Sequence, residues 1–352
     1  MIEVYYYILT FFWALFIALF AIPSIIQVAH KKQLLDMPNQ RRLHTSLTPR
    51  LGGLAIFAGF FSAVLTFGDM DASVQKLLAG SIIIFFIGLK DDMVSISAFK
   101  KFFVQFLAAS IVLFMGDVRI VDFYGILGIG RLEDGVSYFL TFIVILGITN
   151  AINLIDGVDG LAGSLISLAL FVYAILGIVL GGADAYSLIY VSVGLLGAMM
   201  GFLKYNFKDA IIFMGDTGSL VSGFIVAYIA ISVSNIQVGY NLNGVLPVLA
   251  VTAIIMPISD TIRVFVIRLL KGDSPFTADR NHFHHRLLSL GLSPMSVVVV
   301  ELIMTIVAIL IVTIGMIFTT PTISFILMII VLMIVYYLVE RRYNVSVHAS
   351  VN

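Results

Sequence analysis

Five groups of polar residues in this otherwise apolar chain could do chemistry, and each lies at the end of a hydrophobic stretch. They are His44-x-x-x-Thr48-Pro49-Arg50-Leu51-Gly52-Gly53, Asp91-Asp92 with Lys101, Asn150-x-x-Asn153-x-x-Asp156-Gly157-x-Asp159-Gly160, Phe213-Met214-Gly215-Asp216-Thr217-Gly218, and Asp279-Arg280-Asn281-His282-Phe283-His284-His285-Arg286. Carboxylate and amide oxygens suit Mg²⁺, while lysine, arginine and histidine donors suit phosphate. Only 11% of residues are charged, against about a quarter in soluble domains, so these groups indicate a polar reaction site.

The adjacent carboxylates Asp91 and Asp92 repel each other, so the pair is favourable only in water, near cations or around a metal ion. Lys101 follows nine residues after Asp92 and could return positive charge to the same place and hold a phosphate. For an isolated Asp-Asp pair, a solvated loop is the simpler interpretation.

Asn150, Asn153 and Asp156 are spaced by three residues, which places them on one side of a helix. Such groups at the end of a buried helix must pair, bind an ion or meet water, because an Asp at the centre of a span costs about 2.5–3.5 kcal/mol. Asp159 follows in a glycine-containing turn, where capping of the next helix is the alternative to binding.

Asp216 lies where the eighth apolar stretch begins, next to Phe213 and between two glycines. It suits the N-cap of the following helix as well as it suits a metal site. With hard oxygen ligands in the other groups, Mg²⁺ fits such a site better than Zn²⁺.

The histidines His282, His284 and His285 form a dense cluster that a zinc ion could use. Arg280 and Arg286 flank the cluster, and their charge disfavours a bound dication. Cationic or hydrogen-bond-donating histidines beside arginines are more typical of a pyrophosphate clamp.

The first group, from His44 to Gly53, has the least defined role. Arg50 is a candidate phosphate contact, whereas Gly52 and Gly53 are typical of close contact between helices.

The composition predicts an all-α polytopic membrane protein with a single integral-membrane domain over 1–352. Hydrophobic residues make up 61% of the chain, with no cysteine, and the mean hydropathy is +1.10. The missing cysteine excludes disulfides and thiol catalysis. The first apolar stretch lacks the features of a cleaved signal peptide, so we expect a retained span. About eleven apolar stretches are visible: 5–29, 51–68, 77–89, 102–115, 136–154, 161–180, 186–203, 217–234, 245–269, 295–317 and 321–340.

The distribution of Lys and Arg predicts the orientation. With the 30–50 loop inside, the inner loops hold 17 of the 20 basic residues, and only Lys76, Arg119 and Arg131 lie outside. Because cytoplasmic loops are enriched in Lys and Arg, the N-terminus is expected outside and the C-terminus in the cytoplasm. The cytoplasmic loops at 30–50, 90–101, 155–160, 204–216 and 270–294 would then form the site.

Two stretches depart from a plain span. Pro247 and Pro257 interrupt the ninth, which predicts a kinked ninth helix whose cytoplasmic half leans away from the bundle. The glycine-rich segment 116–135 alternates apolar and polar residues, which favours a small external hairpin.

With these motifs in this order, the chain resembles the polyprenyl-phosphate N-acetylhexosamine-1-phosphate transferases over nearly its whole length, from Asp36-x-Pro38-x-x-Arg41-x-x-His44 onward. That family includes the peptidoglycan translocase and the enzymes that begin teichoic acid, O-antigen and enterobacterial common antigen synthesis. The resemblance implies transfer of a sugar-1-phosphate from a UDP-sugar to undecaprenyl phosphate, with Mg²⁺ (or Mn²⁺) and release of UMP, at the cytoplasmic face of a bacterial inner membrane.

Carried over by motif position, the resemblance implies the following roles. Asp216 and Asn153 would bind the metal, Asp91 and Asp92 would handle the lipid phosphate, and Lys101 would hold phosphate. Asp159 and Phe213 would contact uracil, with Asp156 in the same pocket.

The residue pattern His282-Phe283-His284-His285 resembles the N-acetylglucosamine branch of the family. The peptidoglycan enzyme has three consecutive histidines at this place instead. A different UDP-HexNAc, such as UDP-MurNAc-pentapeptide, UDP-GalNAc or a deoxysugar nucleotide, is the alternative within the class. A secondary transporter is the alternative outside it, although transporter sites usually lie near the midplane between repeated halves. The expected partners are the UDP-sugar, undecaprenyl phosphate and the bilayer; a homodimer is left open and no nucleic acid is expected.

Overall fold

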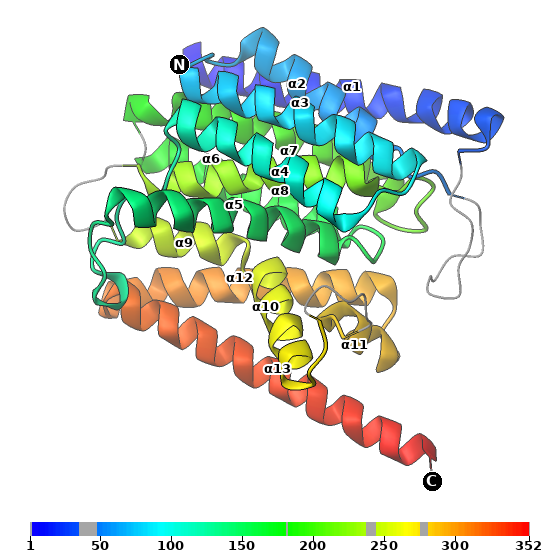
Figure 1. The fold of residues 1–352 in the computed structure, drawn as a ribbon, viewed down its shortest axis with the longest axis vertical. Helices are drawn as coiled ribbons and strands as arrows, with labels where there is room; N and C mark the ends of the chain where they lie inside the picture. Colours follow the sequence, from blue (N-terminus) through cyan, green and yellow to red (C-terminus); the bar gives the residue numbers. More distant parts are fainter. Residues whose placement is uncertain (1, 35–47, 181, 237–243, 275–280, 352) are drawn as a thin grey trace.

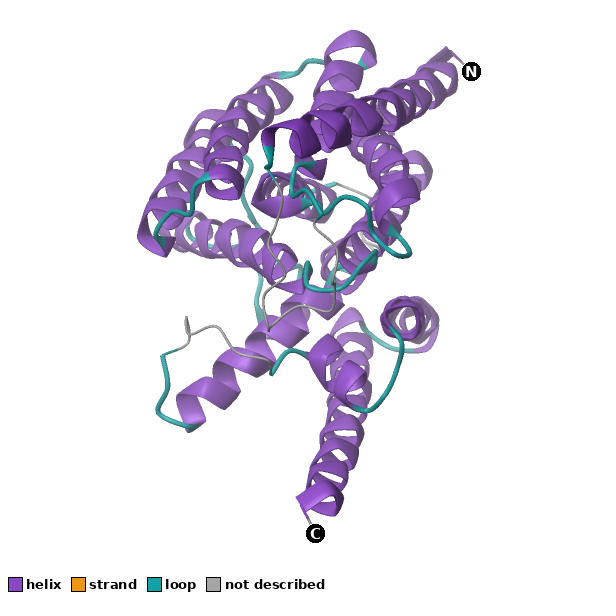
Figure 2. Ribbon diagram, turned by 90° about the vertical axis from the view of Figure 1, so that its right-hand side faces the viewer, coloured by secondary structure: helices purple, strands orange, loops and turns teal. Residues whose placement is uncertain are grey.

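The computed structural model describes residues 2–34, 48–180, 182–236, 244–274 and 281–351. Within these ranges the chain is helical and contains no strand, as Figure 2 also shows. The α-helices are α1 (Ile2–Lys32), α2 (Gly52–Phe67), α3 (Ala72–Met93), α4 (Ala98–Ser110), α5 (Asp134–Ile155), α6 (Leu161–Leu180), α7 (Tyr186–Asn206), α8 (Gly215–Ser234), α9 (Val245–Ala253), α10 (Ile255–Leu270), α11 (Phe283–Ser289), α12 (Pro294–Phe318) and α13 (Pro321–Val351).

Helix α8 forms the centre of the bundle. It packs against α2, α3, α5, α6 and α9, and it is the most completely buried of the candidate spans. Its small residues permit this packing, because a Cβ atom on Gly53 of α2 would lie 2.2 Å from the backbone nitrogen of Gly218. This contact agrees with the helix-contact interpretation of the Gly52-Gly53 pair. Helices α12 and α13 lie along one side of the bundle (Figure 1).

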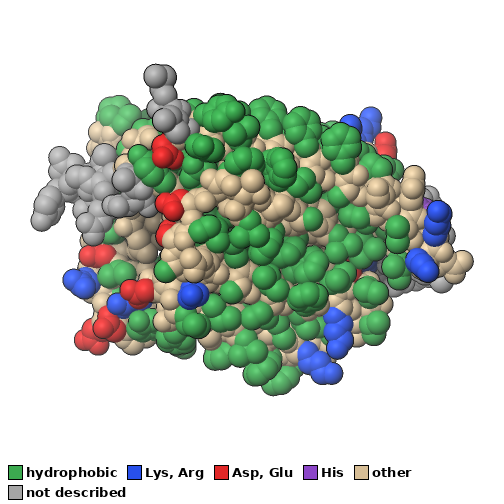
Figure 3. Space-filling model, turned by 90° about the horizontal axis from the view of Figure 1, so that it is seen from above, with side chains coloured by type: hydrophobic (Ala, Val, Ile, Leu, Met, Phe, Trp, Pro, Cys, Tyr) green, Lys and Arg blue, Asp and Glu red, His purple; other side chains and the backbone are tan. Residues whose placement is uncertain are grey.

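The protein is a polytopic membrane protein. Nine helices among the described residues are long and apolar enough to cross a membrane, and the bent pair α9–α10 would make ten. Hydrophobic side chains cover most of the face in Figure 3, while charged side chains lie toward its two ends. Each of the eleven expected stretches coincides with a helix, but α2 has only 16 residues. It is short because the chain before it, at Pro49 and Gly52, forms backbone hydrogen bonds with Phe213 instead of continuing the helix.

The predicted kink of the ninth span is confirmed. Helices α9 and α10 are bent by 73°, at Ile254, and α10 leaves the bundle toward α13 (Figure 1). Pro257 stands in the first turn of α10, where its missing N–H leaves no helical hydrogen bond unmade.

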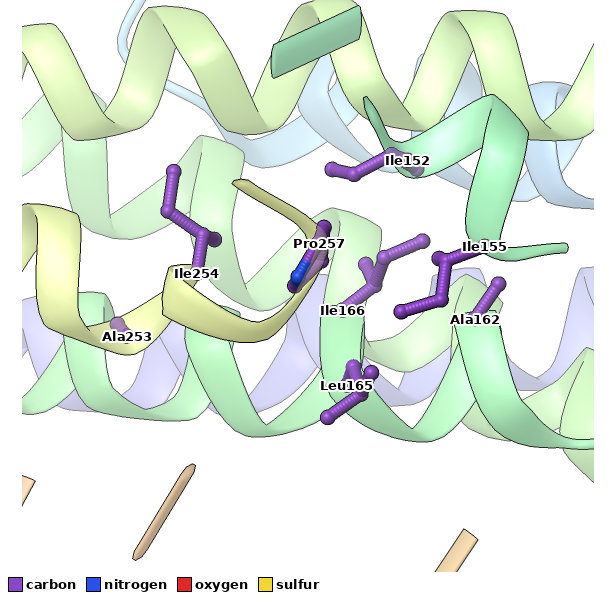
Figure 4. A pocket seen from close by; sticks show the side chains of 8 residues that line it. All are labelled: Ile152, Ile155, Ala162, Leu165, Ile166, Ala253, Ile254 and Pro257. Atoms are coloured by element: carbon purple, nitrogen blue, oxygen red, sulfur yellow. The ribbon is translucent and has the colours of Figure 1, made fainter. Parts of the chain in front are cut away.

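The bend leaves a small apolar pocket between α5, α6 and the α9–α10 junction. Figure 4 shows the side chains that line it: Ile152, Ile155, Ala162, Leu165, Ile166, Ala253, Ile254 and Pro257.

The 116–135 segment forms a hairpin that is too irregular to contain a β-strand. Asp122 and Arg131 form an isolated antiparallel bridge, and a 3-10 turn at Ile126–Gly128 reverses the chain between them.

Candidate active site

Asp92 of α3 caps the start of α8. Its Oδ1 atom accepts from the Asp216 N–H at 2.7 Å, and its Oδ2 atom accepts from the Thr217 N–H at 2.9 Å and the Thr217 hydroxyl at 2.5 Å. These N–H groups have no partner within the helix, so a carboxylate there is doubly favourable. Gly88, one turn before Asp92, permits this approach, because a Cβ there would lie 2.6 Å from Thr217 Cα.

The N-cap interpretation of Asp216 is therefore wrong. Met214 is the N-cap residue of α8 and makes no side-chain capping bond, whereas Asp216 lies within the first turn. Because Asp92 supplies the cap, the Asp216 side chain is available for other contacts.

Lys101 of α4 joins two carboxylates from different helices. Its Nζ atom lies 2.6 Å from Asp91 Oδ2 and also contacts Asp216 Oδ2. Asp91 in turn accepts from the Ile96 N–H at 2.7 Å. The three side chains remain 14–27% exposed, so a ligand can reach them.

Asn153 of α5 lies on the other side of Asp216. Its Nδ2 atom is 3.4 Å from Asp216 Oδ1 and 2.8 Å from the Ser219 hydroxyl. We call Asp91, Asp92, Lys101, Asn153 and Asp216 the carboxylate cluster.

The donors of this cluster fit Mg²⁺. No group of three or more His, Cys, Asp or Glu side chains suited to a metal occurs in the described ranges. Mg²⁺ does not require one, because it commonly binds one or two carboxylates and completes its coordination with water and substrate phosphates. Asp216 and Asn153 would supply a carboxylate and an amide oxygen.

Gly215 is a position that only glycine can occupy. Its φ is +70°, and a Cβ there would lie 2.3 Å from the Arg50 carbonyl oxygen and 2.6 Å from Asp92 Oδ2. The backbone on either side is fixed as well, since the Phe213 N–H donates to the Pro49 carbonyl at 2.8 Å and the Phe213 carbonyl accepts from the Gly52 N–H at 2.9 Å. The 48–53 segment and the 213–216 segment therefore form one unit.

Asp156 and Asp159 follow α5 in a turn beside the cluster. Burial, together with the negative charges of Asp216, Asp92 and Asp159, raises the pKa of Asp156 to about 7, and Arg50 acts in the opposite direction. Asp159 Oδ2 accepts from the Ala210 N–H at 3.0 Å, which ties this turn to the loop before α8.

Asn150 faces α4 instead of the carboxylates. Its amide donates to Gln105 Oε1 at 2.7 Å and to the Leu146 carbonyl at 2.8 Å. Gln105 lies one helical turn after Lys101 and is 2% exposed. This pair fixes α4 against α5, and so fixes the height of Lys101.

The histidines are carried on a separate arm formed by α10 and α11, which we call the histidine arm. His284 is 1% exposed, and its Nε2 atom would be 3.0 Å from a Cβ on Gly157, so the arm contacts the Asp156–Gly160 turn. Burial lowers the pKa of His284 to about 3, with the neighbouring His285 acting in the same direction. Of the two forms expected for the histidines, His284 therefore adopts the neutral one.

His282 and His285 lie on either side of His284. The His282 and His284 rings are stacked with centroids 5.6 Å apart, and the His285 centroid is 4.3 Å from that of His284. His44 and Arg280 lie outside the described residues.

Sequence reasoning missed several polar contacts of this site. Gln105, Thr217 and Asp260 each pair with a candidate residue far away in the chain. A glutamine four residues after Lys101 in an apolar helix was the one visible signal, because it shares the face of that lysine.

The comparisons with known proteins agree with this geometry. The family model described as glycosyl transferase family 4 matches residues 74–234, which include the whole carboxylate cluster. A Bacillus subtilis protein named probable undecaprenyl-phosphate N-acetylglucosaminyl 1-phosphate transferase is 35% identical over 84% of this chain and 81% of its own length.

Two further relatives carry similar names. The decaprenyl-phosphate N-acetylglucosaminephosphotransferase of Mycobacterium tuberculosis is 32% identical over 82% of this chain and 77% of its own length. The undecaprenyl-phosphate alpha-N-acetylglucosaminyl 1-phosphate transferase of Escherichia coli K12 is 29% identical over 91% and 87%.

Fold, acidic site and relatives together define an integral-membrane transferase. The chain belongs to the polyprenyl-phosphate N-acetylglucosamine-1-phosphate transferases of glycosyl transferase family 4.

Proposed function

We propose that the protein transfers N-acetylglucosamine-1-phosphate from UDP-N-acetylglucosamine to undecaprenyl phosphate and releases UMP, the first step of a cell-envelope glycopolymer. The observation that carries the proposal is Lys101 held between Asp91 and Asp216, with Asn153 beside them. The names of the relatives support the sugar and the lipid.

The reaction is a displacement at the sugar-bearing phosphorus. An oxygen of the lipid phosphate forms a bond to that phosphorus, and the bond to the bridging oxygen breaks, so that this oxygen and its electron pair leave with UMP. Such transfers depend mainly on alignment and charge neutralisation. Mg²⁺ held by Asp216 and Asn153 would supply part of that neutralisation.

The two adjacent aspartates would divide the work. Asp92 already accepts three hydrogen bonds from the start of α8, so its part is to position Asp216. Asp91, which is paired with Lys101 at 2.6 Å, would meet the lipid phosphate, and Lys101 would bind phosphate when the substrate displaces its carboxylate partners.

The nucleotide would lie along the Asp156–Gly160 turn. Asp159 and Phe213 would contact uracil, with Asp156 in the same pocket. The diphosphate or sugar would be contacted by Arg50, Arg280 and the histidines at 282, 284 and 285. His284 contacts this turn at Gly157, which places the histidines beside the nucleotide.

Purified protein in lipid nanodiscs tests the activity directly. With UDP-N-acetylglucosamine, undecaprenyl phosphate and Mg²⁺ it should release UMP and form a lipid-linked sugar, and Asp216→Asn protein is the matched control. Release of UMP only from UDP-GalNAc or UDP-MurNAc-pentapeptide would correct the sugar, and no release from any UDP-HexNAc would refute the enzyme assignment.

We infer eleven spans in a bacterial cytoplasmic membrane, with α2 as a short span, α9–α10 as a bent one and the site facing the cytoplasm. The 17-to-3 distribution of basic residues supports this orientation. Because the chain has no cysteine, single cysteines can be labelled cleanly. Lys76→Cys should react with an impermeant maleimide in intact spheroplasts and Lys208→Cys should not; the reverse pattern would invert the topology.

A further inference from the structure

Two residues of α10 hold the chain at the start of α11, over the three consecutive residues 281–283. Asp260 accepts from the His282 ring at Nδ1 (2.9 Å) and from the Phe283 N–H (2.9 Å). Arg263 donates to the Asn281 carbonyl and, at 3.1 Å, to Asp260 itself. These bonds fix the position of the chain where α11 begins.

The contact with the imidazole goes beyond what holding the backbone requires. Asp260 is 2% exposed, and its bond to the Phe283 N–H would by itself hold the backbone at the start of α11. A carboxylate at Nδ1 keeps a proton on that nitrogen and orients the ring, as outer partners of functional histidines do.

We propose that Asp260 is a positioning residue that keeps the proton of His282 on Nδ1, so that Nε2 is the ring nitrogen that meets the diphosphate of the sugar nucleotide. The orientation of the ring stands on the geometry alone, whereas the diphosphate contact rests on the proposed function. The His284 ring is stacked on the His282 ring, with centroids 5.6 Å apart, and lies against Gly157.

Charged and titratable groups from four helices surround this pair, so its charge and its hydrogen bond must be separated by experiment. They are Arg263 of α10, His284 and Arg286 of α11, Glu301 of α12, and Tyr336 and Glu340 of α13. Glu301 is a useful control because it is 1% exposed and neither of its oxygens has a hydrogen-bond partner within the described ranges.

Asp260→Asn keeps one oxygen for the Phe283 N–H but places an N–H donor against Nδ1. The neutral ring must then carry its proton on Nε2. Nitrogen-15 NMR of histidine-labelled protein in nanodiscs, with His282→Gln used to assign the signal, should show Nδ1–H at alkaline pH in the unmodified protein and Nε2–H in the variant. The KM for UDP-N-acetylglucosamine should rise roughly 10- to 100-fold in the variant, with a smaller change in kcat.

Glu301→Gln is the same chemical change on the neighbouring helix and should leave both the tautomer and the KM unchanged. A His282 proton on Nε2 in the unmodified protein, or no switch in Asp260→Asn, would overturn the positioning role. A switched tautomer with unchanged KM, or an equal KM rise in Glu301→Gln, would overturn the link to the substrate. If the unmodified protein releases no UMP at all, the proposed function fails, and the NMR arm still decides the role of Asp260.

Discussion

The carboxylate cluster and the histidine arm are both polar sites carried by hydrophobic helices, and in both a carboxylate holds the start of a helix, but one lies at the centre of the bundle and the other at its edge. The cluster is fixed by backbone groups at the centre of the bundle, where Asp92 binds two N–H groups of α8 and Gly215 admits no side chain. The arm lies at the edge, where Asp260 and Arg263 hold its backbone and further side chains connect it to α13.

On the arm, Arg263 and Arg286 form ion pairs with Glu340 of α13 at 3.6 and 3.3 Å, and Arg286 lies 4.0 Å from the Tyr343 ring centroid. A site for metal and phosphate needs atoms held to a fraction of an ångström. The contacts between the arm and α13, by contrast, are ones that other side chains could replace.

The first and largest expected effect falls at the centre of the cluster. Asp216→Asn removes the carboxylate shared by Lys101 and the proposed metal, so turnover should fall by at least roughly a hundredfold. Rates of UMP release at saturating Mg²⁺ measure this, and near-normal turnover would remove the metal role from Asp216 and leave the two regions equal.

The second expected effect separates charge from architecture. Lys101→Met removes the cation that now neutralises Asp91 and Asp216, so Mn²⁺ used as a probe should bind about tenfold more tightly or better, even as turnover is lost. Electron paramagnetic resonance titration measures the affinity, with Lys100→Met as the control. Unchanged or weaker binding would show that Lys101 and the metal do not share these carboxylates.

The third expected effect concerns stability. Asp92→Asn cannot accept from both α8 N–H groups and the Thr217 hydroxyl, so a buried donor loses its partner at a cost of about 1–3 kcal/mol. Unfolding in detergent should show this loss, whereas Asp209→Asn in a loop should not. If Asp92→Asn abolishes turnover at full stability, its role is chemical.

Near neutral pH the smallest expected effect lies on the arm, and it grows as the pH falls. Because the pKa of His284 is about 3 in the fold and about 6.5 when unfolded, the unfolded chain binds more protons between these values. This histidine therefore makes the protein less stable as pH falls from about 6.5 toward 3, by at most about 1.4 kcal/mol per pH unit. His284→Gln should flatten that slope in unfolding measurements, and an unchanged slope would place the ring in water.

Much of the fold and part of the site could be predicted because they depend on local sequence. Apolar length located the helices, and the prolines of the ninth stretch indicated that it bends, at Ile254 in the structure. The polar groups also indicated that Lys101 returns to the Asp91–Asp92 pair, and Lys101 does pair with Asp91. These features need only neighbouring residues and the chemistry of their side chains.

The remaining contacts could not be predicted because tertiary packing creates them. Asp92 caps α8 only because Gly88 lets α3 approach Thr217, and Asp260 meets His282 only because α10 bends away from α9. The sequence offers Asp216 as its own cap with equal plausibility, and nothing near Asp260 marks it as a partner for a histidine.

The 73° break at Ile254 has a consequence for how such proteins can diversify. The segment from α10 through α11 follows the break, projects from the bundle and contacts the Asp156–Gly160 turn at Gly157. Exchange of the 255–293 segment between relatives should therefore redirect donor choice while the lipid-phosphate chemistry is inherited intact, which makes the break a natural crossover point for building chimeric transferases.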